Sequence, residues 1–264
     1  MPENTLSGPS APLLDRRLRD QNPWWVNPAA IAGDPHIARL RSSPFVSNPA
    51  VLETMPLTPG DVNTLRGPRQ TGKTTTAKRL IQRLLAQGET RILYYAFDVE
   101  TDNAAIPEVI RRGKTLARRT PGPWFIFLDE VTAIPDWQRG VKYAWDVGMI
   151  HEDFVLCTGS SAHRMGAEQL PGRRGGGRNY IQLGLSFREF CAAVGLDSLP
   201  RETASVLDMA SGRCRDLLQH LYLMEEQLDG ALLDYQRVGG FPAAVADHLR
   251  VREVSTNTVL AVWS

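Results

Sequence analysis

The sequence predicts an α/β fold in which helices flank a parallel sheet and a small helical lid follows. Three observations predict it. Between residues 61 and 183, short apolar runs that suit buried strands alternate with stretches of helical periodicity. A glycine-containing turn joins the first of these strands to the first helix. From Thr203 onward the apolar spacing is purely helical.

Composition sets the broad class. The chain has 264 residues, of which 42% are hydrophobic and 22% charged, as in globular proteins. A net charge of +1 gives no argument for nucleic acid or an anionic membrane as a partner. The three cysteines are far apart and form no CxxC pair, and no apolar run reaches the length of a membrane span. We therefore expect a cytoplasmic protein.

Four segments are expected along the chain. An N-terminal arm and connection should cover residues 1–60, and the α/β core residues 61–183. Residues 184–252 should form the helical lid or the start of a C-terminal region, and residues 253–264 a tail.

The arm should dock on the core. Residues 13–20 have the spacing of a short amphipathic helix, which Asn22-Pro23 should end. Trp24 and Trp25 bury a large area only if they pack, so docking is expected, with an exposed aromatic patch as the alternative. Residues 33–60 are rich in Pro, Gly and Ser and predict an irregular connection.

The core elements follow from local pattern. The expected strands are 62–65, 91–97, 124–128, 153–157 and 180–183. The expected helices are one with apolar residues from Ala77 to Leu85 and a C-cap at Gly88, one at 106–119 and one opening at Pro135. A Ser-x-x-Glu capping box at Ser186 predicts the next helix, and Pro242 the start of the last.

A phosphate-binding motif stands at the first strand–helix junction. The run Gly67–Thr74 fits G-x-x-x-x-G-K-[ST], the P-loop, and has the required strand before it and helix after it. Lys73 should reach the β- and γ-phosphates, and the Thr74 hydroxyl should ligate Mg²⁺. A chance match is the alternative, and the flanking elements argue against it. The residues expected to bind the nucleotide here are Gly67, Pro68, Arg69, Gln70, Thr71, Gly72, Lys73, Thr74 and Thr75.

An acidic pair ends the third expected strand. Asp129 and Glu130 follow four apolar residues, which is the Walker B pattern. Asp129 is expected to hold Mg²⁺, and Glu130 to polarise an attacking water. A helix-capping or surface acid is the alternative for Glu130. Asp98, at the end of the preceding strand, is equally an ordinary loop carboxylate or a support for this site.

Two later segments add candidates. Ser160 and Ser161 follow the fourth expected strand, where either could contact the γ-phosphate or serve as a turn or N-cap. The glycine-rich stretch 170–179 carries Arg173, Arg174 and Arg178. A guanidinium there could neutralise transition-state charge, in cis or from a neighbouring subunit. The alternatives are a disordered basic loop and contacts with another partner.

Taken in order, these motifs resemble a known family. The segments that carry the resemblance are Leu65–Thr75, Phe127–Val131, Thr158–Ala162, Gly172-Arg173, Leu185–Phe190 and Gly239–Pro242. Together they are similar to the prokaryotic AAA+-type P-loop ATPases of the AAA_14 type, whose nucleotide domain is paired with a DUF4143 domain. The resemblance covers roughly residues 15–250, and the Walker motifs alone are generic.

The resemblance implies an AAA+ sheet with ATP and Mg²⁺ as cofactors. It implies Walker roles for Lys73, Thr74, Asp129 and Glu130, sensor 1 at Ser160 or Ser161, and an arginine at Arg173 for the γ-phosphate or a subunit contact. Family members continue well past Gly239–Pro242, so we expect this chain to be truncated in its C-terminal domain.

The leading functional expectation is Mg²⁺-dependent ATP hydrolysis coupled to an unknown protein partner, compatible with a homo-oligomer. The alternatives are a nucleotide-dependent switch and a non-hydrolysing remnant of a truncated ATPase. A small-molecule kinase with the arginine loop as a lid fits the acidic pair poorly. No Asn-Lys-x-Asp motif for guanine is present, and nothing indicates a helix that reads DNA.

Overall fold

The computed structural model describes residues 11–117, 121–160, 177–196, 199 and 213–251. The chain forms two compact units. The first comprises residues 1–42 and 48–183, and the second residues 43–47 and 184–264.

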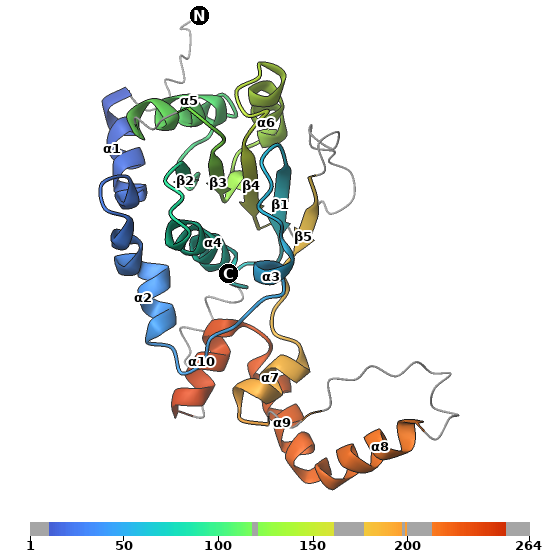
Figure 1. Ribbon diagram of the computed structural model, residues 1–264. Helices are drawn as coiled ribbons and strands as arrows, with labels where there is room; N and C mark the ends of the chain where they lie inside the picture. Colours follow the sequence, from blue (N-terminus) through green and yellow to red (C-terminus); the bar gives the residue numbers. More distant parts are fainter. Residues whose placement is uncertain (1–10, 118–120, 161–176, 197–198, 200–212, 252–264) are drawn as a thin grey trace, which may run out of the picture. The chain divides into compact units, whose positions relative to one another are not determined.

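The first unit contains a sheet of five parallel strands in the order β2-β3-β4-β1-β5 (Figure 1). The strands are β1 Val62–Arg66, β2 Ile92–Ala96, β3 Phe125–Asp129, β4 Phe154–Gly159 and β5 Asn179–Ile181. Helices cover both faces, so β2, β3 and β4 are buried and mostly apolar, whereas β1 is buried but also carries the polar residues Asn63 and Thr64. The α/β fold with a parallel sheet is therefore confirmed.

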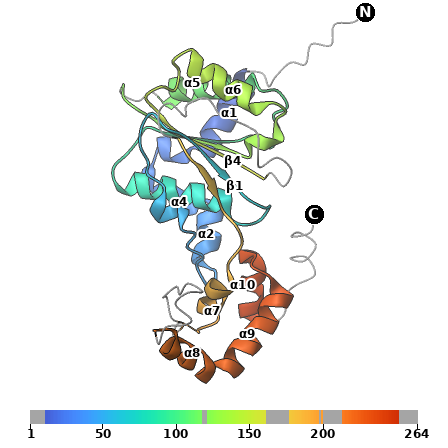
Figure 2. The ribbon, with the colours of Figure 1, turned by 90° about the vertical axis from the view of Figure 1, so that its right-hand side faces the viewer.

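Two helical layers enclose this sheet (Figure 2). One face packs against α1, α5 and α6, and the other against α4 together with α2 and α3. Alternate residues of one strand serve opposite faces: Leu93 and Tyr95 point to the first layer, Ile92 and Tyr94 to the second. The helices of this unit are α1 Ala11–Gln21, η1 Pro23–Trp25, η2 Pro28–Gly33, α2 Pro35–Arg41, α3 Val51–Thr54, α4 Lys73–Ala86, α5 Ala105–Ala117, η3 Val131–Ala133 and α6 Trp137–Asp146.

The expectation that residues 33–60 form only an irregular connection is wrong, because α2 and α3 lie within them. Asp34 caps α2 by accepting a hydrogen bond from the His36 backbone N–H, and Pro35 occupies the first helical position. Ile37 then anchors the helix in the core. Helices of 7 and 4 residues are too short to display a periodic apolar pattern, so composition dominated the sequence-based expectation.

The arm docks on the core, as expected from its paired tryptophans. Trp24 is 1% exposed and lies in the hydrophobic cluster around α4. Both indole N–H groups, of Trp24 and Trp25, donate to the Ile92 carbonyl, at 3.3 and 2.7 Å. The expected helix of the arm is also present, as α1, which lies beside β2 (Figure 1).

These contacts continue along β2, the strand at one edge of the sheet. The Asn22 side chain donates to the Tyr94 carbonyl at 2.8 Å and accepts from the Tyr94 N–H at 2.7 Å. The Gln21 side chain accepts from the Ala96 N–H at 2.8 Å. Polar side chains of the arm thus pair with the outward backbone groups of alternate β2 residues, which protects an edge that could otherwise recruit another strand.

The second unit is helical. Its helices are α7 Phe187–Ala193, α8 Arg213–Leu223, α9 Glu225–Val238 and α10 Pro242–Val251. The capping box at Ser186 is confirmed, since Ser186 and Glu189 exchange both hydrogen bonds. Phe190 and Val245 are fully buried at the centre of its core.

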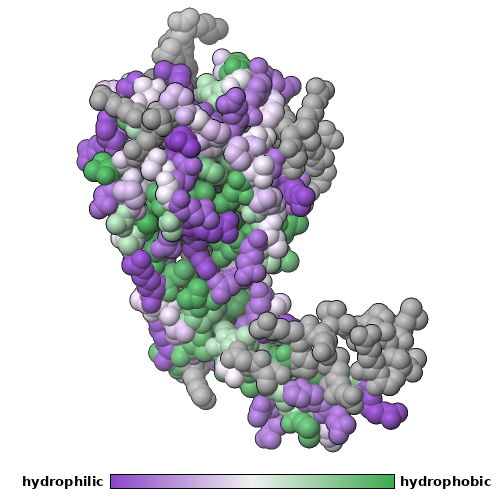
Figure 3. Space-filling model, in the orientation of Figure 1, coloured by the Kyte–Doolittle hydropathy of each residue, from purple (hydrophilic) through white to green (hydrophobic). Residues whose placement is uncertain are grey.

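The helical spacing expected from Thr203 onward is interrupted at Met224, because α8 ends at Leu223 and Met224 is the N-cap residue of α9. Leu218, Tyr222 and Leu223 of α8 are exposed. Hydrophobic residues are visible among hydrophilic ones on this unit in Figure 3. None of the helices in the described part of the chain combines the length and hydropathy needed to cross a bilayer.

Replacing Asn22 with Ala should destabilise the first unit. The change removes both hydrogen bonds between the Asn22 side chain and the Tyr94 backbone and leaves buried polar groups unpaired. We expect the free energy of unfolding to fall by about 2–4 kcal/mol, measured by urea denaturation. Val26→Ala, at a position of the arm that is 92% exposed, is the control and should change stability by less than about 0.5 kcal/mol. Equal stability of the two variants would contradict the role given to Asn22.

Candidate functional site

The expected site residues meet at the carboxyl-terminal edge of the sheet. Strand β4 lies between β1 and β3, with Arg66 opposite Gly159 and Leu128 opposite Cys157. The segments that leave these three strands are therefore neighbours. They carry the Gly67–Thr74 loop, the acidic pair, and Ser160. Ligands of open α/β sheets bind at this edge.

The loop after β1 has the conformation that its glycines allow. A Cβ atom on Gly67 would lie 1.9 Å from the Gln182 carbonyl oxygen, so only glycine fits. Gly72 has a φ of 90°, in the left-handed region, at the N-cap of α4. Gln70, although not glycine, is also left-handed, with a φ of 61°. The loop is thus tightly curled before the helix begins.

Lys73 folds back onto this loop. Its ammonium group donates to the carbonyl oxygens of Gly67 and Pro68, at 3.1 and 2.7 Å. Burial lowers the pKa of Lys73, and the negative charges of Glu130 and Asp129 oppose that shift. Because β4 pairs with both β1 and β3, the loop and the acidic pair leave the sheet at one edge and belong to one site.

The start of α4 suits an anion. Gly72 has no side chain with which to cap the helix, and the first turn contains no acidic residue. Thr74 and Thr75 lie half-buried in that first turn. The backbone N–H groups at a helix N-terminus and the positive end of its dipole favour a negatively charged ligand.

Asp129 is almost fully buried at the end of β3. The Tyr94 hydroxyl donates to its Oδ2 at 2.8 Å, and the Thr158 hydroxyl donates to its Oδ1. Burial, together with the nearby Asp129 charge, raises the pKa of Tyr94 well above its ordinary value, so this hydroxyl remains a donor. Two neutral hydroxyls thus fix the orientation of the carboxylate. Neither Tyr94 nor Thr158 was among the residues expected from sequence, because each belongs to an ordinary buried strand.

Glu130 is held in a left-handed conformation, with a φ of 51°. Ser160 contacts both of its carboxylate oxygens: the hydroxyl donates to Oε1 at 3.0 Å and the backbone N–H to Oε2 at 3.3 Å. The Glu130 N–H donates to the Thr158 hydroxyl at 3.2 Å. The structure therefore brings Ser160 and Glu130 together.

Gln182, just after β5, is a site residue that the sequence did not indicate. Its side chain donates to the Thr71 carbonyl at 2.5 Å and accepts from the Thr76 hydroxyl at 2.9 Å. It is only 5% exposed, and its N–H donates to the Arg66 carbonyl. One side chain therefore joins the loop to the first turn of α4, through contacts across more than a hundred residues that no local pattern reveals.

The remaining candidate residues lie partly inside and partly outside the described part of the chain. Arg173, Arg174 and Ser161 lie outside the described residues. Arg178 is described and exposed, and its backbone N–H donates to the Asn63 side chain. Asp98 follows the end of β2, which is parallel to β3, and therefore lies on the same edge of the sheet. Desolvation raises the pKa of Asp98, and the charge of Asp129 adds to that shift.

The oxygen donors present fit a hard divalent cation. The Thr74 hydroxyl and the Asp129 carboxylate are ligands of the type that Mg²⁺ prefers. Each Asp129 oxygen accepts a side-chain hydrogen bond and retains a lone pair for a metal ion or its bound water. Among the described residues, no three acidic, His or Cys side chains form a metal-binding cluster. Mg²⁺ bound by one or two protein groups ordinarily takes its other ligands from water and from a substrate phosphate.

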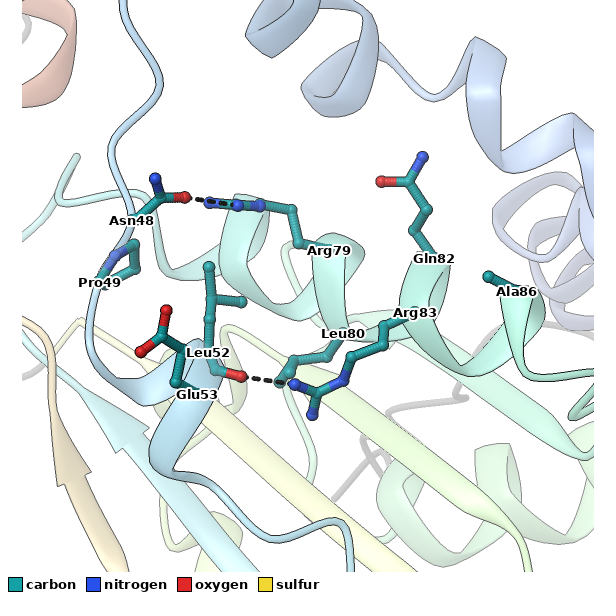
Figure 4. A pocket seen from close by; sticks show the side chains of 9 residues that line it. All are labelled: Asn48, Pro49, Leu52, Glu53, Arg79, Leu80, Gln82, Arg83 and Ala86. Carbon is teal, nitrogen blue, oxygen red and sulfur yellow. Dashed lines mark hydrogen bonds between the residues drawn. The ribbon is translucent and has the colours of Figure 1, made fainter.

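A separate hollow of about 360 Å³ lies along the later turns of α4 (Figure 4). Arg79 and Arg83 line it and bond to Asn48 Oδ1 at 2.7 Å and to the Leu52 carbonyl at 2.6 Å. None of the residues expected to contact a nucleotide lines this hollow.

Several solved structures resemble this chain. Orc1 of Aeropyrum pernix, solved in complex with DNA, is 17% identical, with 97% of this chain and 65% of that chain covered and a TM-score of 0.43. The RuvB Holliday junction branch migration motor of Thermotoga maritima is 17% identical, with 81% and 63% covered and a TM-score of 0.41. PCH-2 of C. elegans is 15% identical, with 86% and 68% covered and a TM-score of 0.35. The chain thus spans less than two thirds of the Orc1 and RuvB chains.

No curated protein matches the sequence. The AAA_14 family model, described as an AAA domain, matches residues 60–191, which contain the loop, the acidic pair and Gln182. The chain belongs to this family of AAA domains.

Proposed function

We propose that this protein binds ATP, hydrolyses it with Mg²⁺, and couples the hydrolysis to a partner protein. One observation carries the proposal. The Gly67–Thr74 loop, whose carbonyls hold the Lys73 ammonium at an uncapped helix N-terminus, leaves the sheet at the edge where Asp129 ends β3 and Glu130 follows it. Cation, acids and backbone donors therefore converge where a nucleoside triphosphate and its metal need them.

The loop and its lysine are assigned to the phosphates. The curled backbone of Gly67–Thr74 with Thr75 would cradle them, and Lys73 would exchange its carbonyl partners for phosphate oxygens. Thr74 and Asp129 would hold Mg²⁺. The metal, when bound, supplies positive charge against the β- and γ-phosphate oxygens. The contact between Gln182 and Thr71 maintains the loop shape on which these roles depend.

Glu130 is assigned the role of general base. Its carboxylate would accept a proton from the attacking water, and Ser160 would orient it through the two contacts described above. Arg173 is proposed to neutralise charge on the γ-phosphoryl group, within the chain or from a neighbouring copy.

A nucleotide-dependent switch is the second candidate. Ser160 donates one hydrogen bond to each carboxylate oxygen of Glu130, so the segment after β4 and this acid are held together. In a switch, nucleotide binding would change the position of that segment, and the bound state itself would be the signal.

Glu130→Gln should retain ATP binding and lose turnover. The amide keeps the shape but cannot act as a base, so phosphate release should fall by about 100-fold or more. Binding and phosphate release are measured on the same preparations with Mg²⁺-ATP. Glu152→Gln, at an exposed acid, should behave as the unaltered chain. Full turnover in the Glu130 variant would remove the assigned role, and binding without turnover in the unaltered chain would favour the switch.

Lys73→Met should weaken ATP binding by about 10- to 100-fold, because charge-assisted hydrogen bonds to the β- and γ-phosphates are lost. AMP lacks those phosphates, so its affinity should change far less. Calorimetric titration of both nucleotides measures the contrast. Lys142→Met, at an exposed lysine, is the control. An equal loss of affinity for ATP and AMP would contradict the placement of Lys73 at the outer phosphates.

Gln182→Ala should also weaken ATP binding, by about 5- to 30-fold. Two buried partners, the Thr71 carbonyl and the Thr76 hydroxyl, lose their hydrogen bonds, which costs about 1–2 kcal/mol in loop ordering. The same titration tests it, with exposed Gln87→Ala as the control. Unchanged ATP affinity would show that the loop keeps its shape without Gln182.

A further inference from the structure

Lys78 is a buried cation whose partners come from outside its own helix. It lies on α4, one turn beyond Thr74, and its side chain is 5% exposed. Its ammonium group pairs with Asp34 Oδ2 at 3.1 Å, and Asp34 belongs to the arm. A buried charge requires such a partner, so the pair fixes the arm to the P-loop helix.

The same ammonium group also lies over aromatic rings. It is 3.3 Å from the centroid of Tyr94 and 5.1 Å from that of Trp24. The Trp24 and Tyr94 rings meet edge to face, with centroids 6.5 Å apart. Cation and indole thus hold the Tyr94 ring in place.

The backbone of Tyr94 is fixed as well, by both hydrogen bonds to the Asn22 side chain. With backbone and ring restrained, the Tyr94 hydroxyl has a set direction, and it donates to Asp129 Oδ2 at 2.8 Å. A continuous series of contacts therefore runs from Asp34 through Lys78 and Tyr94 to Asp129.

We propose that Tyr94 is a positioning residue for the Asp129 carboxylate, and that the arm, through Asp34 and Lys78, sets the metal affinity of the site. The inference rests on the proposed function, because it requires Asp129 to hold the metal. Thr158 fixes the other carboxylate oxygen. Without the Tyr94 hydroxyl the carboxylate would be held at one oxygen only, and its orientation toward a metal would be less defined. Loss of such supporting hydrogen bonds typically weakens metal binding by about 10- to 100-fold.

Tyr94→Phe tests the first step. The ring and its contacts with Lys78 and Trp24 remain, and only the hydroxyl is lost. ATP binding is measured by calorimetry over a range of Mg²⁺ concentrations and in EDTA. We expect the Mg²⁺ concentration for half-maximal enhancement of binding to rise about tenfold, while the affinity for ATP in EDTA stays unchanged. An unchanged Mg²⁺ dependence would overturn the proposal.

Tyr95→Phe is the matched control. Tyr95 is the next residue of β2, equally buried, and its hydroxyl donates to Glu100 at 2.6 Å on the other face of the sheet. Its loss should cost similar stability without moving the Mg²⁺ dependence. If both variants shift that dependence equally, the effect is one of general stability and the proposal fails.

Asp34→Asn tests the arm. Asparagine remains a good N-cap for α2, so the change removes mainly the charge beside Lys78. We expect a smaller rise, about threefold, in the required Mg²⁺ concentration, and little further rise when Asp34→Asn is added to Tyr94→Phe. Full additivity in the double variant would show that Asp34 does not act through Tyr94.

The controls also separate this inference from the proposed function. Mg²⁺-dependent ATP binding without hydrolysis in the unaltered chain would overturn the proposed hydrolysis alone, and the titrations would still decide the role of Tyr94. If Mg²⁺ does not alter ATP binding in the unaltered chain, the metal role of Asp129 and this inference both fail.

Discussion

The Asp129 carboxylate is buried, and a buried carboxylate is stable only if hydrogen-bond donors or positive charges lie close to it. Two hydroxyls, from neighbouring strands, bond one oxygen each, and the Lys73 ammonium lies within electrostatic reach. Since β3 is flanked by β2 and β4, one donor comes from each side. The strand order thus supplies a hydrogen-bond donor to each oxygen of the Asp129 carboxylate. The same order brings the loop after β1 to the carboxyl-terminal edge of the sheet, where Asp129 lies.

The two buried lysines of α4 also require partners for their charge. The Lys73 ammonium donates to carbonyl oxygens of its own loop, whereas that of Lys78, further along the helix, pairs with Asp34 of the arm and lies over the ring of Tyr94. Helix α4, which starts at the Gly67–Thr74 loop, is therefore bonded through Lys78 to Asp34, which precedes that loop by more than thirty residues in the sequence. The arm is in this sense part of the site's framework.

Several elements of the fold and the site could be predicted because each depends on a short run of adjacent residues. The motif Gly67–Thr74, the apolar strand before Asp129 and the capping box at Ser186 are each contained in a few adjacent residues. The roles of Gln182 and Tyr94 could not be predicted, because their partners are brought near by strand pairing and their own neighbours in sequence are ordinary. Helix α2 was not predicted for another reason: its N-cap and its one buried isoleucine do not form a repeating apolar pattern.

The arm's hydrogen bonds to β2 also bear on the order of events during synthesis. Gln21, Asn22 and the two tryptophans leave the ribosome before the strand whose edge they cover. When β2 emerges, the arm side chains that hydrogen-bond its outward backbone groups are already present on the same nascent chain. The strand can then be covered intramolecularly at once, at the high effective concentration of a tethered partner, before a second polypeptide on the same message could pair with it.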